Sequence, residues 1–153
     1  MSPNDPVSSE LLKTFVGEKF AVYDRKWAKN NSLNFAAGFL GPFWLAYRKM
    51  YLYSAIYIAF HIVVMEVLDY LVELPLNVYR GIGFAEIALG LVLGNKLYKN
   101  FVEKKIKLIS SSASGDELKI AVAREGGTNL GAIGLLALGV AGYAYYIYYS
   151  VFS

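Results

Sequence analysis

Three long apolar runs constrain what this chain can fold into more than any other feature. They cover residues 50–74, 81–98 and 130–152, and each has roughly the length that a transmembrane helix needs. The charged residues lie in blocks between them. The chain is 56% hydrophobic and 18% charged, whereas soluble domains average roughly 45–50% and 25%. We therefore expect an all-α integral membrane protein with three transmembrane helices.

A shorter apolar run precedes these three and decides the topology. Its apolar part, residues 35–47, would reach only about 20 Å as a helix, against a hydrocarbon core of roughly 30 Å. Gly41-Pro42 lies in its middle, and proline bends or breaks a helix because it removes a backbone donor. We expect a re-entrant or interfacial segment here, and the sequence leaves open whether it dips into the membrane or lies on it.

The positions of the cations support this topology. If residues 35–47 do not cross, every lysine and arginine except Arg80 lies on the side of the N-terminus. Cytoplasmic loops are enriched in lysine and arginine, so we expect a cytoplasmic N-terminus and a periplasmic or extracellular C-terminus. The residues expected to anchor the short segment at the membrane interface are Pro42, Phe43, Trp44, Arg48 and Lys49.

Two amphipathic segments are expected on the cytoplasmic face of a single membrane domain, residues 8–153. Residues 1–7 should form a flexible tail. Residues 8–29 predict an amphipathic helix, weakened by Gly17, that lies on anionic lipid or packs on the ends of the spans. Residues 99–129 form a basic cytoplasmic segment, into which the helix of the second span continues.

A second helix is expected inside this basic segment. Ser114 and Glu117 match a capping box, in which the serine hydroxyl and the glutamate carboxylate each accept a hydrogen bond from a backbone amide at the helix start. Gly126 and Gly127 would end that helix.

Polar side chains in or near the spans are candidates for function, since intramembrane ionisable residues usually face the protein interior. They are His61, Glu66, Glu86 and Asn95. A charge at mid-membrane costs about 2.5–3.5 kcal/mol, which would cancel most of the insertion energy of the second span. Glu86 should therefore be protonated, paired or close to the outer surface.

Two interpretations of these side chains stay open. One is a proton or cation site formed by Glu66, Glu86 and His61, continued outward by Asp69 and Glu73. The other is a set of interfacial carboxylates with Arg80 as a partner, and a histidine hydrogen-bonded to Tyr57 one turn earlier.

Two GxxxG motifs predict close packing of helices, because small residues let two backbones approach. The first is Gly90 to Gly94, and the second ends at Gly131 and is extended by Gly134. Packing within one chain is favoured over a homodimer or a partner interface.

Residues 34–51 also carry a family resemblance. Their pattern, N-x-A-A-x-x-x-G-P-F-W-x-x-Y-R-K-M-Y, resembles the hallmark of small bacterial inner-membrane proteins known as domain of unknown function 2628. Residues 94–98 and 124–128 are similar to two shorter elements of that family, and Phe35 departs from it where tryptophan often stands. The resemblance spans residues 15–150. It implies a bacterial inner-membrane location and implies no reaction.

Composition narrows the functional classes further. The chain has no cysteine and one histidine, so thiolate sites and imidazole zinc sites are excluded, and no catalytic or cofactor-binding pattern is present. The leading interpretation is a non-catalytic adaptor or scaffold, without cofactor or nucleic acid. It would offer the face of residues 90–94 or its basic inner surface to a membrane protein, a second copy or anionic lipid. The alternative is an oligomeric small transporter or ion-passage unit that uses intramembrane carboxylates.

Overall fold

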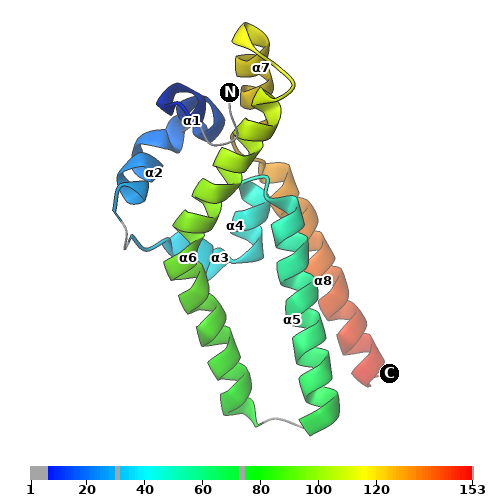
Figure 1. Cartoon of the computed structure of the whole chain (residues 1–153). Helices are drawn as coiled ribbons and strands as arrows, with labels where there is room; N and C mark the ends of the chain where they lie inside the picture. The colour runs from blue at the N-terminus through cyan, green and yellow to red at the C-terminus, as the bar shows by residue number, and fades with distance from the viewer. Residues whose placement is uncertain (1–6, 30–31, 73–74, 153) are drawn as a thin grey trace.

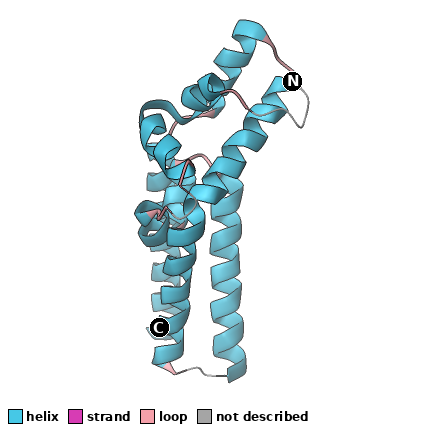
Figure 2. Cartoon of the chain, turned by 60° about the vertical axis from the view of Figure 1, so that its left-hand side comes forward, coloured by secondary structure: helices cyan, strands magenta, loops and turns pink. Residues whose placement is uncertain are grey.

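A computed structural model describes residues 7–29, 32–72 and 75–152, and these residues form helices and short connections (Figures 1 and 2). The elements are α1 (Ser9–Val16), the 3-10 turn η1 (Gly17–Lys19), α2 (Phe20–Trp27), α3 (Phe35–Leu40), α4 (Pro42–Tyr47), α5 (Tyr51–Val72), α6 (Leu76–Ser110), α7 (Gly115–Glu125) and α8 (Leu130–Phe152). The predicted all-helical class is confirmed for these ranges. The predicted tail, apart from Val7, lies outside them.

Among the described residues, three helical stretches are long and apolar enough to cross a membrane. They are Tyr51–Leu68 within α5, Leu76–Ser110, which is α6, and Gly115–Tyr146, which includes α7 and most of α8. α8 has the bounds predicted for the third span. α6 begins at Leu76 instead of residue 81, directly after Pro75, so the predicted connection is helical. α6 also continues to Ser110 as one helix of 35 residues, as predicted.

The short apolar segment forms two six-residue helices, α3 and α4, that meet at Gly41. Gly41 has φ 46° and ψ −117°, a conformation that glycine adopts far more readily than other residues. Pro42 then starts α4, where its missing N–H would have had no helical partner. The predicted break at Gly41-Pro42 is therefore present. α3 packs along α6, whereas α4 packs against α5 and α8 (Figure 1).

The predicted amphipathic helix is broken into α1, η1 and α2. The break lies at Gly17, whose φ of 73° ends α1. The apolar side chains of this segment pack into the protein against α6 and α7 instead of facing outward. They are Leu11, Phe15, Val16 and Tyr23. Of the two interpretations of residues 8–29, packing on the ends of the long helices therefore accounts for the apolar face.

The chain divides into two regions that differ in packing. The packed region comprises residues 7–50 and 90–129, and the long-helix region comprises residues 51–72, 76–89 and 130–152. All buried apolar side chains of the described chain belong to the packed region, with Tyr98, Phe15 and Met50 the largest of those fully enclosed. Both views show the short helices gathered at one end and long helices alone at the other (Figures 1 and 2).

The start of α7 differs from the predicted capping box. Ser114 precedes the helix, but its side chain makes no capping hydrogen bond. The backbone carbonyl of Ser114 instead accepts from the amide of Leu118 at 3.3 Å. Asp116 and Glu117 occupy the first turn, where negative charge favours the positive end of the helix dipole.

Candidate functional site

The first GxxxG motif lies against α3. A Cβ atom added to Gly90 would lie 2.6 Å from the backbone oxygen of Ala37 and 2.8 Å from the Cα of Gly38, and one added to Gly94 would overlap the Ala37 side chain. The motif therefore packs α6 on α3 within one chain, as favoured from the sequence. The same packing places Gly90 and Gly94 against α3, so the glycines of the face of residues 90–94 are occupied within the chain.

Asn95 ties the beginning of α3 to α6. Its side-chain Nδ2 donates to the backbone oxygen of Ser32 at 2.9 Å, and its Oδ1 accepts from Asn34 Nδ2 at 3.0 Å. The Nε1 of Trp27 donates to the Asn95 backbone oxygen at 3.0 Å. Asn34 in turn caps α3 by accepting from the amide of Ala37. This polar residue of the second apolar run is thus buried and hydrogen-bonded within the protein.

Arg48 lies inside the packed region, with only 4% of its surface exposed. Its guanidinium carbon is 4.7 Å from the ring centre of Tyr23, 5.2 Å from that of Tyr98 and 5.4 Å from that of Tyr47. Such distances allow cation–π attraction. Its Nε and Nη1 have no hydrogen-bond partner among the described residues. We call Arg48 with these three tyrosines the arginine cage.

The arginine cage corrects part of the predicted interface anchor. Arg48 is enclosed by aromatic rings from α2 and α6, so its guanidinium does not face lipid headgroups. Trp44 is also buried, with its ring edge-to-face against Tyr98 at 5.9 Å. Pro42, Phe43 and Lys49 remain partly exposed. Sequence reasoning missed the enclosure because Tyr23 and Tyr98 are distant from Arg48 in the chain.

The turn between α4 and α5 contacts the end of α7, just before the glycine pair Gly126-Gly127. Lys49 has φ 59°, and the amides of Lys49 and Met50 donate back to α4, which is the pattern of a Schellman turn. Lys49 Nζ donates to the backbone oxygen of Arg124 at 2.9 Å. The amide of Gly127 donates to the oxygen of Phe15 at 2.6 Å. Residues 34–51, 94–98 and 124–128 therefore all meet in the packed region.

Glu86 forms the second candidate site, in the long-helix region. Its Oε1 lies 2.9 Å from His61 Nδ1, and its Oε2 accepts from Tyr57 Oη at 3.1 Å. Tyr57 and His61 occupy successive turns of α5, so the carboxylate bridges α6 to α5. An apolar cavity of about 250 Å³ between α3, α4, α5 and α6 is lined in part by Glu86 and Tyr57. The arrangement can hold a proton shared between a carboxylate and an imidazole.

Glu66 shares no hydrogen-bond partner with Glu86 among the described residues. Its Oε1 accepts from Tyr143 Oη of α8 at 2.9 Å, so it links α5 to α8. The predicted set of Glu66, Glu86 and His61 is thus separated into two hydrogen-bonded groups. The side chain of Asp69 and the whole of Glu73 lie outside the described residues. Within the described ranges, no group of three or more residues is suited to hold a metal ion.

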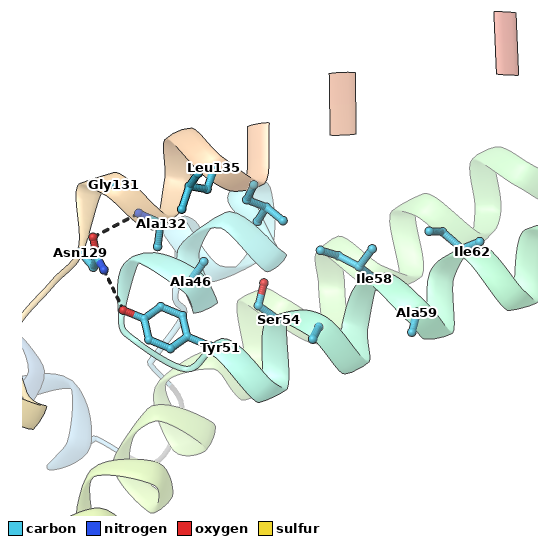
Figure 3. A pocket seen from close by; sticks show the side chains of 12 residues that line it. Ala46, Tyr51, Ser54, Ile58, Ala59, Ile62, Asn129, Gly131, Ala132 and Leu135 are labelled. Carbon is cyan, nitrogen blue, oxygen red and sulfur yellow. Dashed lines mark hydrogen bonds between the residues drawn. The ribbon is translucent and has the colours of Figure 1, made fainter. Parts of the chain in front are cut away.

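The second GxxxG motif makes no comparable helix contact. A Cβ atom at Gly134 would meet nothing within 4 Å among the described residues, and one at Gly131 would approach only Asn129 Oδ1, at 3.3 Å. Gly131 instead lines an apolar groove between α5 and α8, with Ala46 of α4 at its end (Figure 3). Asn129 closes this end by donating to Tyr51 Oη at 2.8 Å and accepting from the amide of Ala132 at 3.1 Å (Figure 3).

A basic pocket of about 560 Å³ lies between the end of α2, the connection to α3, and α6. Four lysines line it: Lys26, Lys29, Lys96 and Lys99. These cations were predicted to belong to the basic inner surface, but their meeting in one pocket was not predictable, because α2 and α6 are far apart in the chain. The available signal was a spacing of three residues, for Lys26 and Lys29 in the predicted helix of residues 8–29 and for Lys96 and Lys99 on α6, since such residues share a helix face.

A comparison with protein-family models matches residues 4–104 of the 153 to the family described as protein of unknown function (DUF2628). The match includes residues 34–51 and 94–98, whereas residues 124–128 and the whole of α7 and α8 lie beyond it. No curated protein and no solved structure matches the chain. Because the match covers about two thirds of the sequence, this chain belongs to the DUF2628 family.

Proposed function

We propose that this protein is a small non-catalytic adaptor of the bacterial cytoplasmic membrane, inserted through α5, α6 and α8. The packed region, with the N-terminus, would face the cytoplasm, and the end of α8 would face the other side. Two observations support this orientation. α1 and the end of α8 lie at opposite ends of the molecule (Figure 1). All lysines and arginines except Arg80 belong to the packed region, as expected for a cytoplasmic side.

The observation that carries the adaptor proposal is the construction of the packed region. Its helices enclose all the buried apolar side chains of the described chain, and α3 and α4 connect it to the long helices. An adaptor needs a rigid body fixed to its membrane anchor and a surface that a partner can recognise. The buried core supplies the first, and the exposed lysines supply the second.

Partner capture with matched variants tests this proposal. The tagged full-length chain would be purified from its native host in mild detergent, and the co-purifying proteins identified. We expect one stable set that survives Glu66→Gln and Glu86→Gln but is lost on Lys13→Glu with Lys104→Glu, which reverses two exposed charges of the packed region. Loss through the carboxylate changes, with retention through the lysine changes, would contradict the proposal.

The orientation has a separate test. A reporter that is active only in the cytoplasm, fused after Ser153, should be inactive, and the same reporter at the N-terminus should be active. Activity at the C-terminal position would overturn the three-span orientation with its cytoplasmic packed region.

A second candidate function, ion or proton passage by an oligomer, is favoured by the Glu86 site. A carboxylate hydrogen-bonded to an imidazole next to an apolar cavity has the chemistry of a proton-binding step. This function predicts flux across vesicles containing the purified protein, and loss of that flux on Glu86→Gln and on His61→Gln. Under the adaptor proposal, these vesicles would show the same flux as protein-free vesicles.

A further inference from the structure

We propose that the basic pocket between α2 and α6 binds the headgroup of an anionic phospholipid. This inference rests on the proposed membrane insertion and names one ligand of the packed region. The pocket has the size of a small-molecule site, since such sites measure roughly 300–1,000 Å³. It lies where the connection before α3 is tied to α6 through Asn95, so its walls are held together by hydrogen bonds.

The side chains that line the pocket carry a net positive charge, which favours the binding of an anion. Four lysines face one carboxylate, Glu103, which leaves a net charge of three (four minus one). Glu103 already lies 3.9 Å from Lys99 Nζ. Lys26 Nζ donates one hydrogen bond to the Leu33 backbone oxygen at 3.0 Å and keeps two more protons. Lys29 and Lys96 have no ion pair within the described part of the chain.

Asn95, Ser32 and Trp27 use their polar groups within the protein, whereas the side-chain amide of Asn100, which also lines the pocket, has no hydrogen bond among the described residues. Asn95 Nδ2 is taken by the oxygens of Ser32, and Asn95 Oδ1 accepts from Asn34. The indole N–H of Trp27 is taken by the Asn95 backbone oxygen. The donors left free are therefore mainly ammonium groups, which favour a phosphate over a neutral polar ligand.

Apolar side chains beside the lysines favour a lipid over a soluble phosphate as the ligand of this pocket. Val92 and Leu93 line the same pocket one turn before Lys96 on α6, with 61% and 48% of their surfaces exposed. In the proposed orientation these side chains lie on the membrane side of the lysines. Trp27 also lines the pocket, and tryptophan favours the headgroup level of a bilayer. A molecule with a phosphate and an acyl chain contacts both parts, whereas free phosphate contacts only the lysines.

A second basic pocket, between the start of α5 and the end of α6, shows why the first is preferred. It is lined by Lys49, Lys104 and Lys105. Lys49 Nζ is already bonded to the Arg124 backbone oxygen, and Lys105 Nζ lies 3.3 Å from Glu125 Oε2. Two of its three cations thus have partners inside the protein, and fewer ammonium protons remain for a ligand.

Brominated lipids provide the test, because bromine quenches a neighbouring tryptophan. The chain has two tryptophans, Trp27 at the pocket and Trp44, which is buried. The full-length protein would be placed in phosphatidylcholine vesicles with increasing amounts of brominated phosphatidylglycerol, or of brominated phosphatidylcholine as a neutral control. We expect quenching to saturate at a low fraction of phosphatidylglycerol, and the neutral lipid to quench only in proportion to its amount.

Matched variants assign the binding to the pocket. Lys29→Gln with Lys96→Gln should weaken phosphatidylglycerol binding by about 25-fold, about fivefold for each lysine near a membrane surface. Lys13→Gln with Lys19→Gln removes the same charge from α1 and η1 and should change binding less than twofold. Equal weakening in both variants would mean general charge attraction and would overturn the proposed site. Circular dichroism and thermal unfolding would establish that each variant is folded.

A soluble competitor separates the two sources of phosphate. Glycerol 3-phosphate at millimolar concentration should leave the quenching unchanged, because it lacks acyl chains. Full displacement would identify a site for a soluble phosphate and overturn the lipid assignment. If phosphatidylglycerol shows no preference while the partner set and the C-terminal reporter behave as expected, this inference fails and the adaptor proposal stands. If the reporter after Ser153 is active, the proposed orientation fails first.

Discussion

The two parts of α6 have the same secondary structure and different surroundings. Its buried residues all lie between Gly94 and Ile106, and none lies in the first part, residues 76–89. The first part exposes large apolar side chains such as Phe84 and Leu89. One continuous helix is therefore packed against other helices along one part and exposes its large apolar side chains along the other.

This difference predicts how the two parts respond to change. In the packed part, glycine and asparagine are required because another backbone or a buried donor lies directly against them. In the first part, a substitution that stays apolar or helix-compatible meets little protein. Side chains of the long-helix region are instead joined at separate points, such as Glu86 with His61 and Glu66 with Tyr143.

The largest effect is expected in a comparison of two single variants of α6, in each of which one glycine is replaced by alanine. Gly90→Ala places a Cβ against backbone atoms of Ala37 and Gly38, which cannot move aside as a side chain can, so we expect a loss of about 2–3 kcal/mol. Gly83→Ala meets nothing within 4 Å among the described residues and should be neutral or stabilise by up to about 1 kcal/mol. Thermal unfolding in mild detergent measures both. Equal effects would mean that the two parts of α6 do not differ in packing.

A smaller effect is expected in the arginine cage. Arg48→Lys keeps the charge but replaces a planar, weakly hydrated guanidinium with a compact, strongly hydrated ammonium, so contact with three rings is lost. We expect destabilisation by about 1–2 kcal/mol. Arg80→Lys, at an exposed position of the first part of α6, is the matched control and should leave stability unchanged. Unfolding with denaturant compares them, and an unaltered Arg48→Lys protein would show that the rings contribute only apolar enclosure.

A third prediction concerns how the packed region holds α8. Asn129→Ala removes the acceptor for the amide of Ala132 and the donor to Tyr51, and we expect a loss of about 1 kcal/mol. Asn129→Asp keeps the acceptor and should recover most of that loss. Amide hydrogen exchange in the first turn of α8 measures the effect locally. Faster exchange in both variants alike would assign the role to the Tyr51 contact instead of the cap.

The extent of these elements was largely predictable from local sequence. Hydropathy located α5 and α8, and Gly41-Pro42 located the break between α3 and α4, because both signals lie within a few neighbouring residues. The start of α6 was missed because residues 76–80 after Pro75 lack the apolar character used to find a span. Helical backbone there needs no apolar side chains, since its hydrogen bonds are internal.

The side-chain environments were less predictable, because they depend on tertiary contacts. A cation after an apolar run is typical of a membrane interface, yet Arg48 is enclosed by rings from two other helices. Glu86 was expected to be paired, protonated or close to the surface, and it is paired with His61 and Tyr57. The separation of Glu66 from this pair depends on Tyr143 in α8, and no spacing rule connects Tyr143 to Glu66.

The smallest effect is expected for an exposed ion pair between α7 and α1 in the packed region. Lys119 Nζ of α7 lies 2.8 Å from Glu10 Oε1 of α1, and this hydrogen bond holds the pKa of the Glu10 carboxyl below its ordinary value of 4.5. The same bond raises the pKa of Lys119 above 10.5. The contribution to stability is therefore present between these two values. It is lost as pH falls through the lowered pKa of Glu10, and again as pH rises through the raised pKa of Lys119.

Comparing Glu10→Gln with the wild type across pH measures this contribution. The difference in unfolding temperature should be small near neutral pH, since the pair is exposed, and it should vanish once the pH has fallen through the lowered pKa of Glu10, and also in high salt. Glu18→Gln, an exposed glutamate without an ion pair in the described chain, is the control and should show no such pH dependence. A difference that persists at low pH, where the Glu10 carboxyl is neutral, would show that the charge of Glu10 is not its cause and would contradict this account of the contact with α7.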